Sequence, residues 1–133
     1  MFSGAISVRI LSEDHILAVR SKARWFAEKI GFNIAAANVL SVIISETARL
    51  IFSKTKYGRM DIFSVNNQTK RGIAVMAIIE EMERDNAEIR GYAKQEIIRR
   101  TDLGKLVSKK IIDEYKTFPG ANNDTLMQFI KWV

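Results

Sequence analysis

The clearest candidate for chemistry is Glu46, a carboxylate within a largely apolar stretch, 41–51. At helical spacing, residues such as Ile43 and Leu50 make more than half of the circumference apolar. The stretch therefore predicts the centre of a buried helix that is packed on more than one side. A buried glutamate has either a partner or a task. The partner within reach is Arg49, one turn further along. If this pair is half-buried, Glu46→Gln should cost about 1–3 kcal/mol of stability.

Other groups that could do chemistry are scarce. The chain has no Cys, which excludes disulfides, cysteine zinc sites and a thiol nucleophile. Its single histidine, His15, falls in the first turn of a predicted helix, on the polar side, with no second ligand nearby in sequence. This pattern is typical of a solvated residue rather than a metal ligand. We therefore expect no metal site.

The composition indicates one domain spanning 1–133, with 47% hydrophobic and 27% charged residues. No apolar run approaches the roughly 18 residues of a membrane span, and the first residues lack a signal-peptide pattern. We therefore expect a cytoplasmic protein without a membrane partner. The net charge of +6 permits nucleic acid or an acidic protein as partner. Segment 80–116, however, carries nine Lys or Arg and nine Asp or Glu. This mixture favours a solvated face over a nucleic-acid-binding stripe.

The first half of the chain reads as a strand followed by two helices. Residues 6–10 alternate between apolar and polar, as in a strand. Ser12 is a predicted N-cap for a helix that continues to about Ile30, where Gly31 ends it. Asn33 is the predicted cap of the second helix, which contains Glu46 and ends near 54–55.

The second half predicts two strands, two helices and a last strand. The expected elements are strands 59–65 and 72–79 around a polar loop 66–70, helices 87–100 and 103–115, a turn 118–124, and a strand 125–133. Strand 72–79 is apolar on both faces, as in a central strand. The order β-α-α-β-β-α-α-β predicts an α/β fold with helices over one face of a mixed sheet.

The whole chain resembles the RsbT/RsbW group of small anti-sigma-type serine kinases, within the GHKL ATPase superfamily. It is most similar to the RsbT branch, the switch kinases of the stressosome. The matching stretches are 8–10, 27–32, 44–49, 71–73, 109–115 and 125–132. The resemblance implies a two-layer α/β sandwich of the Bergerat type. It also implies STAS-domain partners, which these kinases bind and phosphorylate on Ser or Thr.

The same resemblance assigns nucleotide-binding positions that this sequence does not fill. The family's Glu-x-x-x-Asn motif places a general base at Glu46, but the Mg²⁺-binding Asn is Leu50 here. The Asp that accepts the adenine amino group falls at or near Ile79, and no glycine follows it before 86. Of the glycine-rich phosphate loop only Gly104 remains. Leucine offers no oxygen to a hard cation, and phosphates need free backbone N–H groups.

These losses predict that the fold is kept and the nucleotide site is dismantled. Each loss costs about 1–3 kcal/mol, so the three together move a micromolar site toward millimolar or weaker. We expect a non-catalytic pseudo-kinase without a cofactor, binding a STAS-domain protein in a partner-switching or stressosome-like pathway. The alternative is an active ATP-dependent serine/threonine kinase or anti-sigma regulatory factor that phosphorylates a STAS-domain protein. Its Mg²⁺ would be held by Asn38, Asp85 or Asn86. A homodimer is compatible with either hypothesis.

Overall fold

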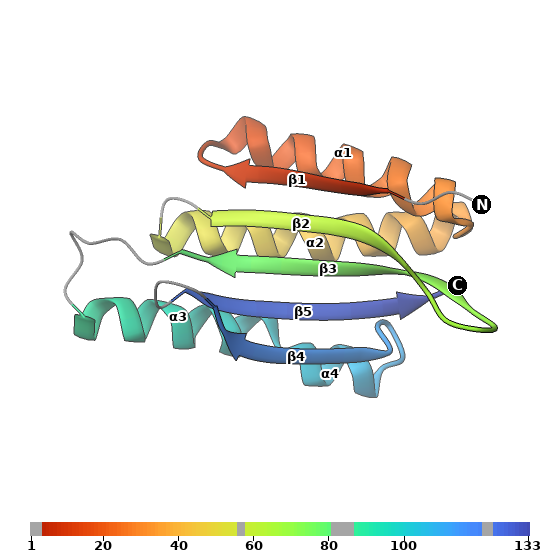
Figure 1. Cartoon of the computed structure of the whole chain (residues 1–133). Coiled ribbons are helices and arrows are strands. Elements are labelled where there is room, and N and C mark those ends of the chain that lie inside the picture. Colours follow the sequence, from red (N-terminus) through yellow and green to blue (C-terminus); the bar gives the residue numbers. More distant parts are fainter. Residues whose placement is uncertain (1–3, 56–57, 81–86, 121–123) are drawn as a thin grey trace.

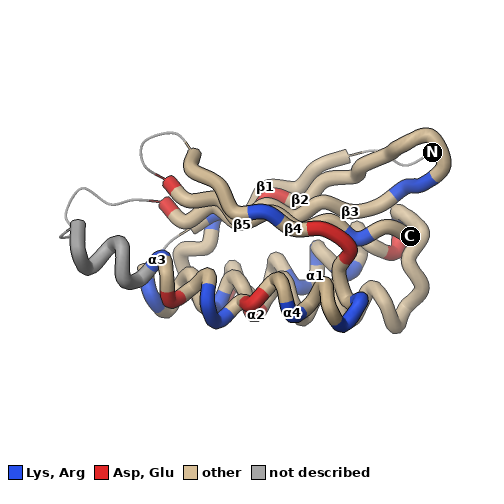
Figure 2. Tube along the Cα trace, turned by 90° about the horizontal axis from the view of Figure 1, so that it is seen from below, with Lys and Arg blue, Asp and Glu red and all other residues tan. Residues whose placement is uncertain are grey.

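The computed structural model describes residues 4–55, 58–80, 87–120 and 124–133, and for 87–93 it describes the backbone alone. The elements in chain order are β1 (Ala5–Ile10), α1 (Glu13–Ile30), α2 (Ile34–Thr55), β2 (Gly58–Asn66), β3 (Arg71–Ile79), α3 (Ala87–Thr101), α4 (Leu103–Ser108), β4 (Glu114–Pro119) and β5 (Thr125–Trp132). They form two layers, a five-stranded sheet and a layer of helices on one of its faces (Figures 1 and 2). The predicted α/β sandwich is confirmed.

The sheet is antiparallel throughout, so the predicted mixed sheet is wrong. Its strand order is β1-β2-β3-β5-β4, and each neighbouring pair is antiparallel. The helical hairpin α1–α2 returns the chain to the end of the sheet that β1 reached, so β2 runs opposite to β1. After β3, the helical segment α3–α4 makes a single pass back. The additional strand β4 then reverses the chain once more, and β5 therefore runs antiparallel to β3.

Strand β4 is absent from the sequence prediction, which assigned 103–115 to one helix. The apolar period that suggested this helix is real, but α4 ends at Ser108. Lys110 has a positive φ of 61°, which turns the backbone out of the helix. The Asp113 N–H then donates to the Ile130 carbonyl at 2.9 Å and begins the pairing with β5. The predicted turn 118–124 also starts too early, because β4 continues to Pro119, and 121–123 lie outside the described residues.

The two long helices form where local signals predicted them. The Asn33 carboxamide oxygen accepts the Ala36 N–H at 2.8 Å, which confirms the predicted cap of α2. Gly31 ends α1 with a φ of 125°, a value that a side chain disfavours. The predicted core stripe of α1 is buried in full: Ile16, Val19, Ala23, Phe26, Ala27 and Ile30. This stripe packs α1 onto the sheet.

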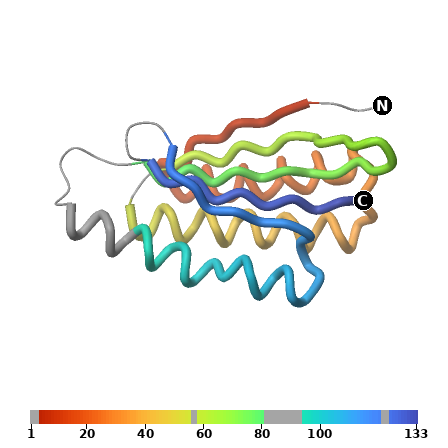
Figure 3. Tube along the Cα trace, turned by 60° about the horizontal axis from the view of Figure 1, so that its bottom comes forward, coloured from red at the N-terminus to blue at the C-terminus, as the bar shows by residue number. Residues whose placement is uncertain are grey.

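Helix α2 is the middle helix of the layer, with α1 on one side and α3 and α4 on the other (Figure 3). By length and composition it is the one described helix that could cross a membrane. In the fold, however, its residues Leu40, Ile44, Ala48 and Ile51 are buried in the main core. Its apolar character therefore serves packing on the sheet.

Candidate functional site

The outer side of α2 carries an exposed row of residues at the positions i, i+3, i+7 and i+10, which we call the α2 stripe: Val39, Val42, Glu46 and Arg49. Val42 is 41% exposed, and Val39 is exposed to a similar degree. Since α1 runs antiparallel to α2, the exposed Leu17 of α1 lies level with this stripe. The stripe therefore combines apolar surface with a carboxylate and a guanidinium on a rigid helix.

Glu46 is on the surface, so its predicted burial is wrong. Its side chain is 63% exposed, and its carboxylate lies 3.9 Å from the Arg49 guanidinium. Arg49 also reaches across to α1, where its Nη1 donates to the Glu13 carboxylate at 3.2 Å. The sequence prediction took the wide apolar circumference of α2 as evidence of packing on more than one side, with Glu46 inside that packing. The valines of the α2 stripe show that part of this circumference faces solvent.

Because Glu46 is exposed, Glu46→Gln should change the free energy of unfolding by less than about 0.5 kcal/mol. An exposed pair at this separation gains little Coulomb energy in water, and Arg49 keeps Glu13 as a partner. Urea unfolding of the wild type and the variant measures the difference. A loss above about 1 kcal/mol would contradict the exposed placement of this carboxylate.

Leu50 lies one turn beyond Glu46 and is half-buried. The neighbouring helix α3 packs beside α2, and its Ile97 is fully buried in the main core. Near this contact, a hydrogen bond from Arg99 lowers the pKa of the Glu96 carboxyl below its ordinary value, and the charge of Lys54 on α2 acts in the same direction. The contact between α2 and α3 thus combines apolar packing with a carboxylate, Glu96, that is already bonded to Arg99 on its own helix.

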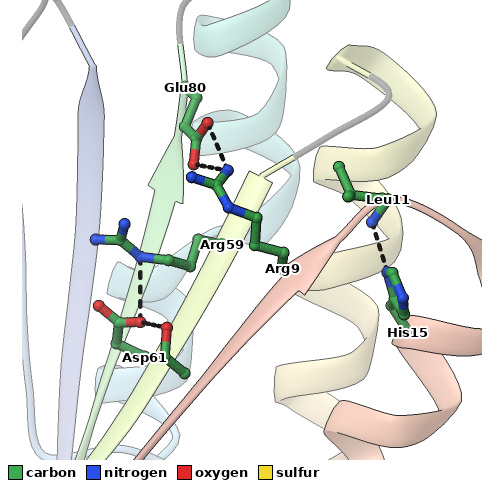
Figure 4. A network of polar contacts seen from close by, with 7 residues as sticks. Arg9, Leu11, His15, Arg59, Asp61 and Glu80 are labelled. Atoms are coloured by element: carbon green, nitrogen blue, oxygen red, sulfur yellow. Dashed lines mark hydrogen bonds and ion pairs between the residues drawn. The ribbon is translucent and has the colours of Figure 1, made fainter.

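Ile79 is the last residue of β3 and is fully buried in the core. The next residue, Glu80, turns to the other face of the sheet and accepts two hydrogen bonds from Arg9 Nη1, at 2.7 and 2.9 Å (Figure 4). Both oxygens of the carboxylate thus contact one charged nitrogen, and charge-assisted hydrogen bonds of this kind are among the stronger ones in proteins. Glu80, directly after β3, is therefore held to Arg9 of β1 by an ion pair, and 81–86 lie outside the described residues.

Gly104 lies in the first turn of α4 and packs against Tyr115 of β4. A Cβ at this position would lie 3.2 Å from the Tyr115 hydroxyl oxygen, so the glycine makes room for that ring. The preceding Asp102 caps α4, and its carboxylate accepts the Lys105 N–H at 3.3 Å. Gly104 thus belongs to a short capped helix, beside a hollow of about 330 Å³ that Asp102 and Tyr115 also line.

His15, the single histidine, makes a local contact and is not joined by other potential metal ligands among the described residues. His15 Nδ1 accepts the Leu11 N–H at 3.0 Å, a contact within the turn that starts α1 (Figure 4). Within the described ranges, no group of three or more His, Asp or Glu residues has the proximity to hold a metal ion. Of the alternative Mg²⁺ ligands, Asn38 is exposed on α2, and Asp85 and Asn86 lie outside the described residues.

Glu46 and Leu50 lie on one helix, α2, as their spacing predicted, whereas Ile79 ends β3 in the core and Gly104 lies in the first turn of α4. The residues that sequence reasoning missed are the valines of the α2 stripe and Leu17. Their sequence signal is apolar residues at helical spacing in a position where a surface helix normally carries polar ones.

Comparison with known proteins adds one relative and no family model. No protein-family model matches the chain. The chain is 29% identical over 128 residues to the serine/threonine-protein kinase RsbT of Bacillus subtilis (strain 168), a match that covers 95% of both proteins. A match of this extent spans both the helical layer and the sheet, and it supports a regulatory role of the kinase-family type. The predicted resemblance to the RsbT-like kinases is thereby confirmed over almost the whole chain.

Proposed function

We propose that this protein is a non-catalytic member of the RsbT-like group that binds a STAS-domain protein in the cytoplasm, in a partner-switching or stressosome-like pathway. The observation that carries this proposal is Leu50. The position that supplies the Mg²⁺ ligand in the family is a half-buried hydrocarbon side chain, one turn from the exposed Glu46. A leucine gives a hard cation no ligand.

The other two positions support the same proposal. Ile79 is part of the packed core, so an adenine-binding carboxylate has no counterpart there. At the start of α4, the Lys105 N–H already bonds Asp102, whose negative charge would repel a phosphate. The described residues at these positions therefore do not fit ATP and Mg²⁺.

The helical layer supplies a surface suited to an acidic protein partner. Segments 13–55 and 87–113 contain thirteen Lys or Arg against eight Asp or Glu. The described Lys and Arg residues recur along the helical layer (Figure 2). The α2 stripe lies in this layer and adds apolar contact area next to Arg49. Positive surroundings speed the encounter with an acidic partner, and the apolar centre then supplies the binding energy.

The test is complex formation with candidate STAS-domain proteins, by size-exclusion chromatography and calorimetry, with and without ATP and Mg²⁺. We expect a complex of unchanged affinity in both conditions, with an association rate that falls as salt is raised. Val42→Asp should weaken the complex at least tenfold, about 1.4 kcal/mol. The matched control is Ile34→Asp, an exposed residue in the first turn of the same helix, where the dipole favours an acid.

Three outcomes would contradict the proposal. A complex that requires ATP and Mg²⁺ would favour the active kinase, for which the exposed carboxylate of Glu46 is the supporting observation. Recovery of nucleic acid alone, with a steep salt dependence, would favour a nucleic-acid-binding role. Equal binding by Val42→Asp and wild type would place the partner on a surface other than the α2 stripe.

A further inference from the structure

Strand β4 is an edge of the described sheet, since it pairs with β5 on one side and with no other described strand (Figure 1). Its residues from Glu114 to Thr117 are all exposed. One of them is Tyr115, a large aromatic side chain that is 49% exposed. An edge strand offers its backbone N–H and C=O groups to any extended chain that lies beside it. Strand β4 is therefore a candidate docking edge.

The direction of the backbone groups of β5 follows from contacts at its end. The Val133 N–H, directly after β5, donates to the Arg71 carbonyl of β3 at 2.8 Å. The Trp132 N–H donates instead to the Asp113 carboxylate, on the β4 side, at 2.7 Å. The Ile130 carbonyl likewise accepts the Asp113 N–H at 2.9 Å. Because this direction alternates along a strand, the even-numbered residues of β5 direct their N–H and C=O groups toward β4.

The register between the two strands transfers this alternation to β4. The even-numbered residues of β5 lie opposite Glu114, Lys116 and Phe118, so these three form the backbone pairs with β5. The residues between them, Tyr115 and Thr117, therefore direct their N–H and C=O groups away from β5. Pro119, the next residue in this series, has no N–H to leave unpaired. Tyr115 and Thr117 are thus the open positions of the edge.

A hollow of about 330 Å³ lies beside these open positions, between β4 and the α3–α4 segment. Tyr115 and Thr117 line it from β4, and Ile98 and Leu103 give it apolar walls. Gly104 keeps it open, since even a Cβ there would lie 3.2 Å from the Tyr115 hydroxyl oxygen. In an added strand, the residues opposite the two open positions direct their side chains to the same face of the sheet. The hollow can therefore receive apolar side chains from alternate positions of that strand.

The surroundings of the β4 edge are basic. Segment 99–119 contains six Lys or Arg against three Asp or Glu. Two of the acids, Asp113 and Glu114, accept the backbone and indole N–H groups of Trp132, and the third caps α4. Lys116 stands on β4 itself, between the open positions, and projects to the other face of the sheet. An acidic chain complements this distribution of charge.

We propose that the β4 edge binds an extended acidic peptide segment of a partner protein, which adds to the five-stranded sheet as an antiparallel sixth strand. Apolar residues of the segment alternate with acidic ones. The apolar residues lie opposite Tyr115 and Thr117, over the hollow, and the acidic residues face Lys116. Backbone hydrogen bonds hold the segment, and the alternating side chains select it. The residues of this edge are distinct from those of the α2 stripe.

The charge of the edge disfavours a second copy of β4 as its occupant. One antiparallel register uses the open N–H and C=O groups of both Tyr115 and Thr117 in each copy. This register places the Lys116 side chains of the two copies directly opposite each other. Like charges in this arrangement are destabilising. The edge therefore favours a partner segment of different sequence, with acidic residues at these positions.

The probe is a capped peptide of alternating Glu and Val, labelled and titrated by fluorescence anisotropy. We expect saturable binding with a dissociation constant of about 100 μM or tighter at low salt, and weaker binding as salt is raised. The same peptide with methylated valine nitrogens keeps its charge but lacks the donors that face β4. It should bind at least about tenfold more weakly. A peptide with Lys in place of Glu should not saturate the protein.

A matched pair of variants tests the same contact from the protein side. Thr117→Pro removes an open N–H, whereas Thr117→Val keeps it with a side chain of similar size. An edge strand tolerates proline where the N–H faces solvent, so Thr117→Pro should keep the wild-type circular dichroism and yet bind the acidic peptide at least about tenfold more weakly. Thr117→Val should bind as the wild type does. Equal binding by Thr117→Pro and the wild type would overturn the proposal.

The peptide comparison decides the question even if Thr117→Pro fails to fold. Equal binding of the methylated and unmethylated peptides to the wild type, or no saturable binding of the acidic peptide, would overturn the proposal. Binding of an oligothymidylate but not of the acidic peptide would assign the basic surroundings to nucleic acid and also overturn it. So would a wild-type dimer, measured by light scattering, that becomes monomeric in Thr117→Pro, because the edge would then bind a second copy.

Hydrogen exchange followed by NMR locates the added strand residue by residue. In the free protein the Lys116 N–H, which faces β5, should exchange more slowly than the N–H groups of Tyr115 and Thr117. The acidic peptide at saturation should slow the exchange of Tyr115 and Thr117 at least about tenfold. Protection that appears instead on β1, the other edge of the described sheet, would place the peptide there and overturn the proposal.

Discussion

ATP and ADP should fail to saturate this protein at millimolar concentration, with or without Mg²⁺. Leu50 supplies no oxygen for the metal, Ile79 is packed in the core, and Asp102 takes up an N–H at the start of α4. Together these losses cost roughly 3–9 kcal/mol of nucleotide affinity. Taken from the about 8.2 kcal/mol of a micromolar site, a loss of about 6 kcal/mol, the middle of that range, leaves a dissociation constant far above 1 mM.

Calorimetric titration measures this directly, with the Bacillus subtilis kinase RsbT as the positive control. Leu50→Asn is the matched variant, since it restores the metal ligand of the family motif on the same helix as Glu46. It should still fail to bind nucleotide, because the adenine and phosphate positions are unchanged. A dissociation constant below about 100 μM for the wild type, near 5.5 kcal/mol, would contradict the non-catalytic proposal.

Ile79→Asp should unfold the protein rather than restore an adenine-binding carboxylate. Ile79 is 0% exposed and packs in the main core under the helices. Aspartate there loses the hydrophobic contacts of isoleucine and places a carboxylate in an apolar setting. The two effects together cost on the order of 5 kcal/mol or more, a large part of the roughly 5–15 kcal/mol stability of a domain.

Thermal unfolding followed by circular dichroism measures this change, and Ile79→Val is the control. The valine variant removes one methylene group and should cost only about 0.5–1.5 kcal/mol. If Ile79→Asp instead stayed folded and gained nucleotide binding, the end of β3 would be an intact adenine site lacking a single group. The burial of Ile79 would then no longer argue against nucleotide binding.

Local signals in the sequence were sufficient for the long helices and the inner strands. The Asn33 cap, the Gly31 stop and the apolar period of α1 act within a few residues, and each is found in the structure. The continuous apolar run of β3 likewise predicted a strand buried from both sides. These features depend on the chain's own backbone and its immediate neighbours, so they can be predicted without knowledge of the fold.

The motif positions were also assigned by sequence alone, but their surroundings were not. Spacing placed Glu46 and Leu50 on one helix. Whether Glu46 is buried depends on which side of α2 other elements cover, and that is a property of the layer as a whole. Of the apolar residues that suggested burial, Ile44 and Ile51 lie in the core, whereas Val42 belongs to the exposed α2 stripe.

Strand β4 and the placement of the described helices over one face of the sheet were decided only in three dimensions. Residues 109–115 continue an apolar helical period, yet the backbone leaves the helix at Lys110 and pairs with β5 instead. A strand of this kind exists because a partner strand satisfies its N–H and C=O groups, and that partner is distant in sequence. Which of the two alternating sets of residues in β2 and β3 would face the helices was equally open in the sequence. The described helices all cover one face of the sheet because α1, α2 and the α3–α4 segment cross back on the same side, which no local pattern specifies.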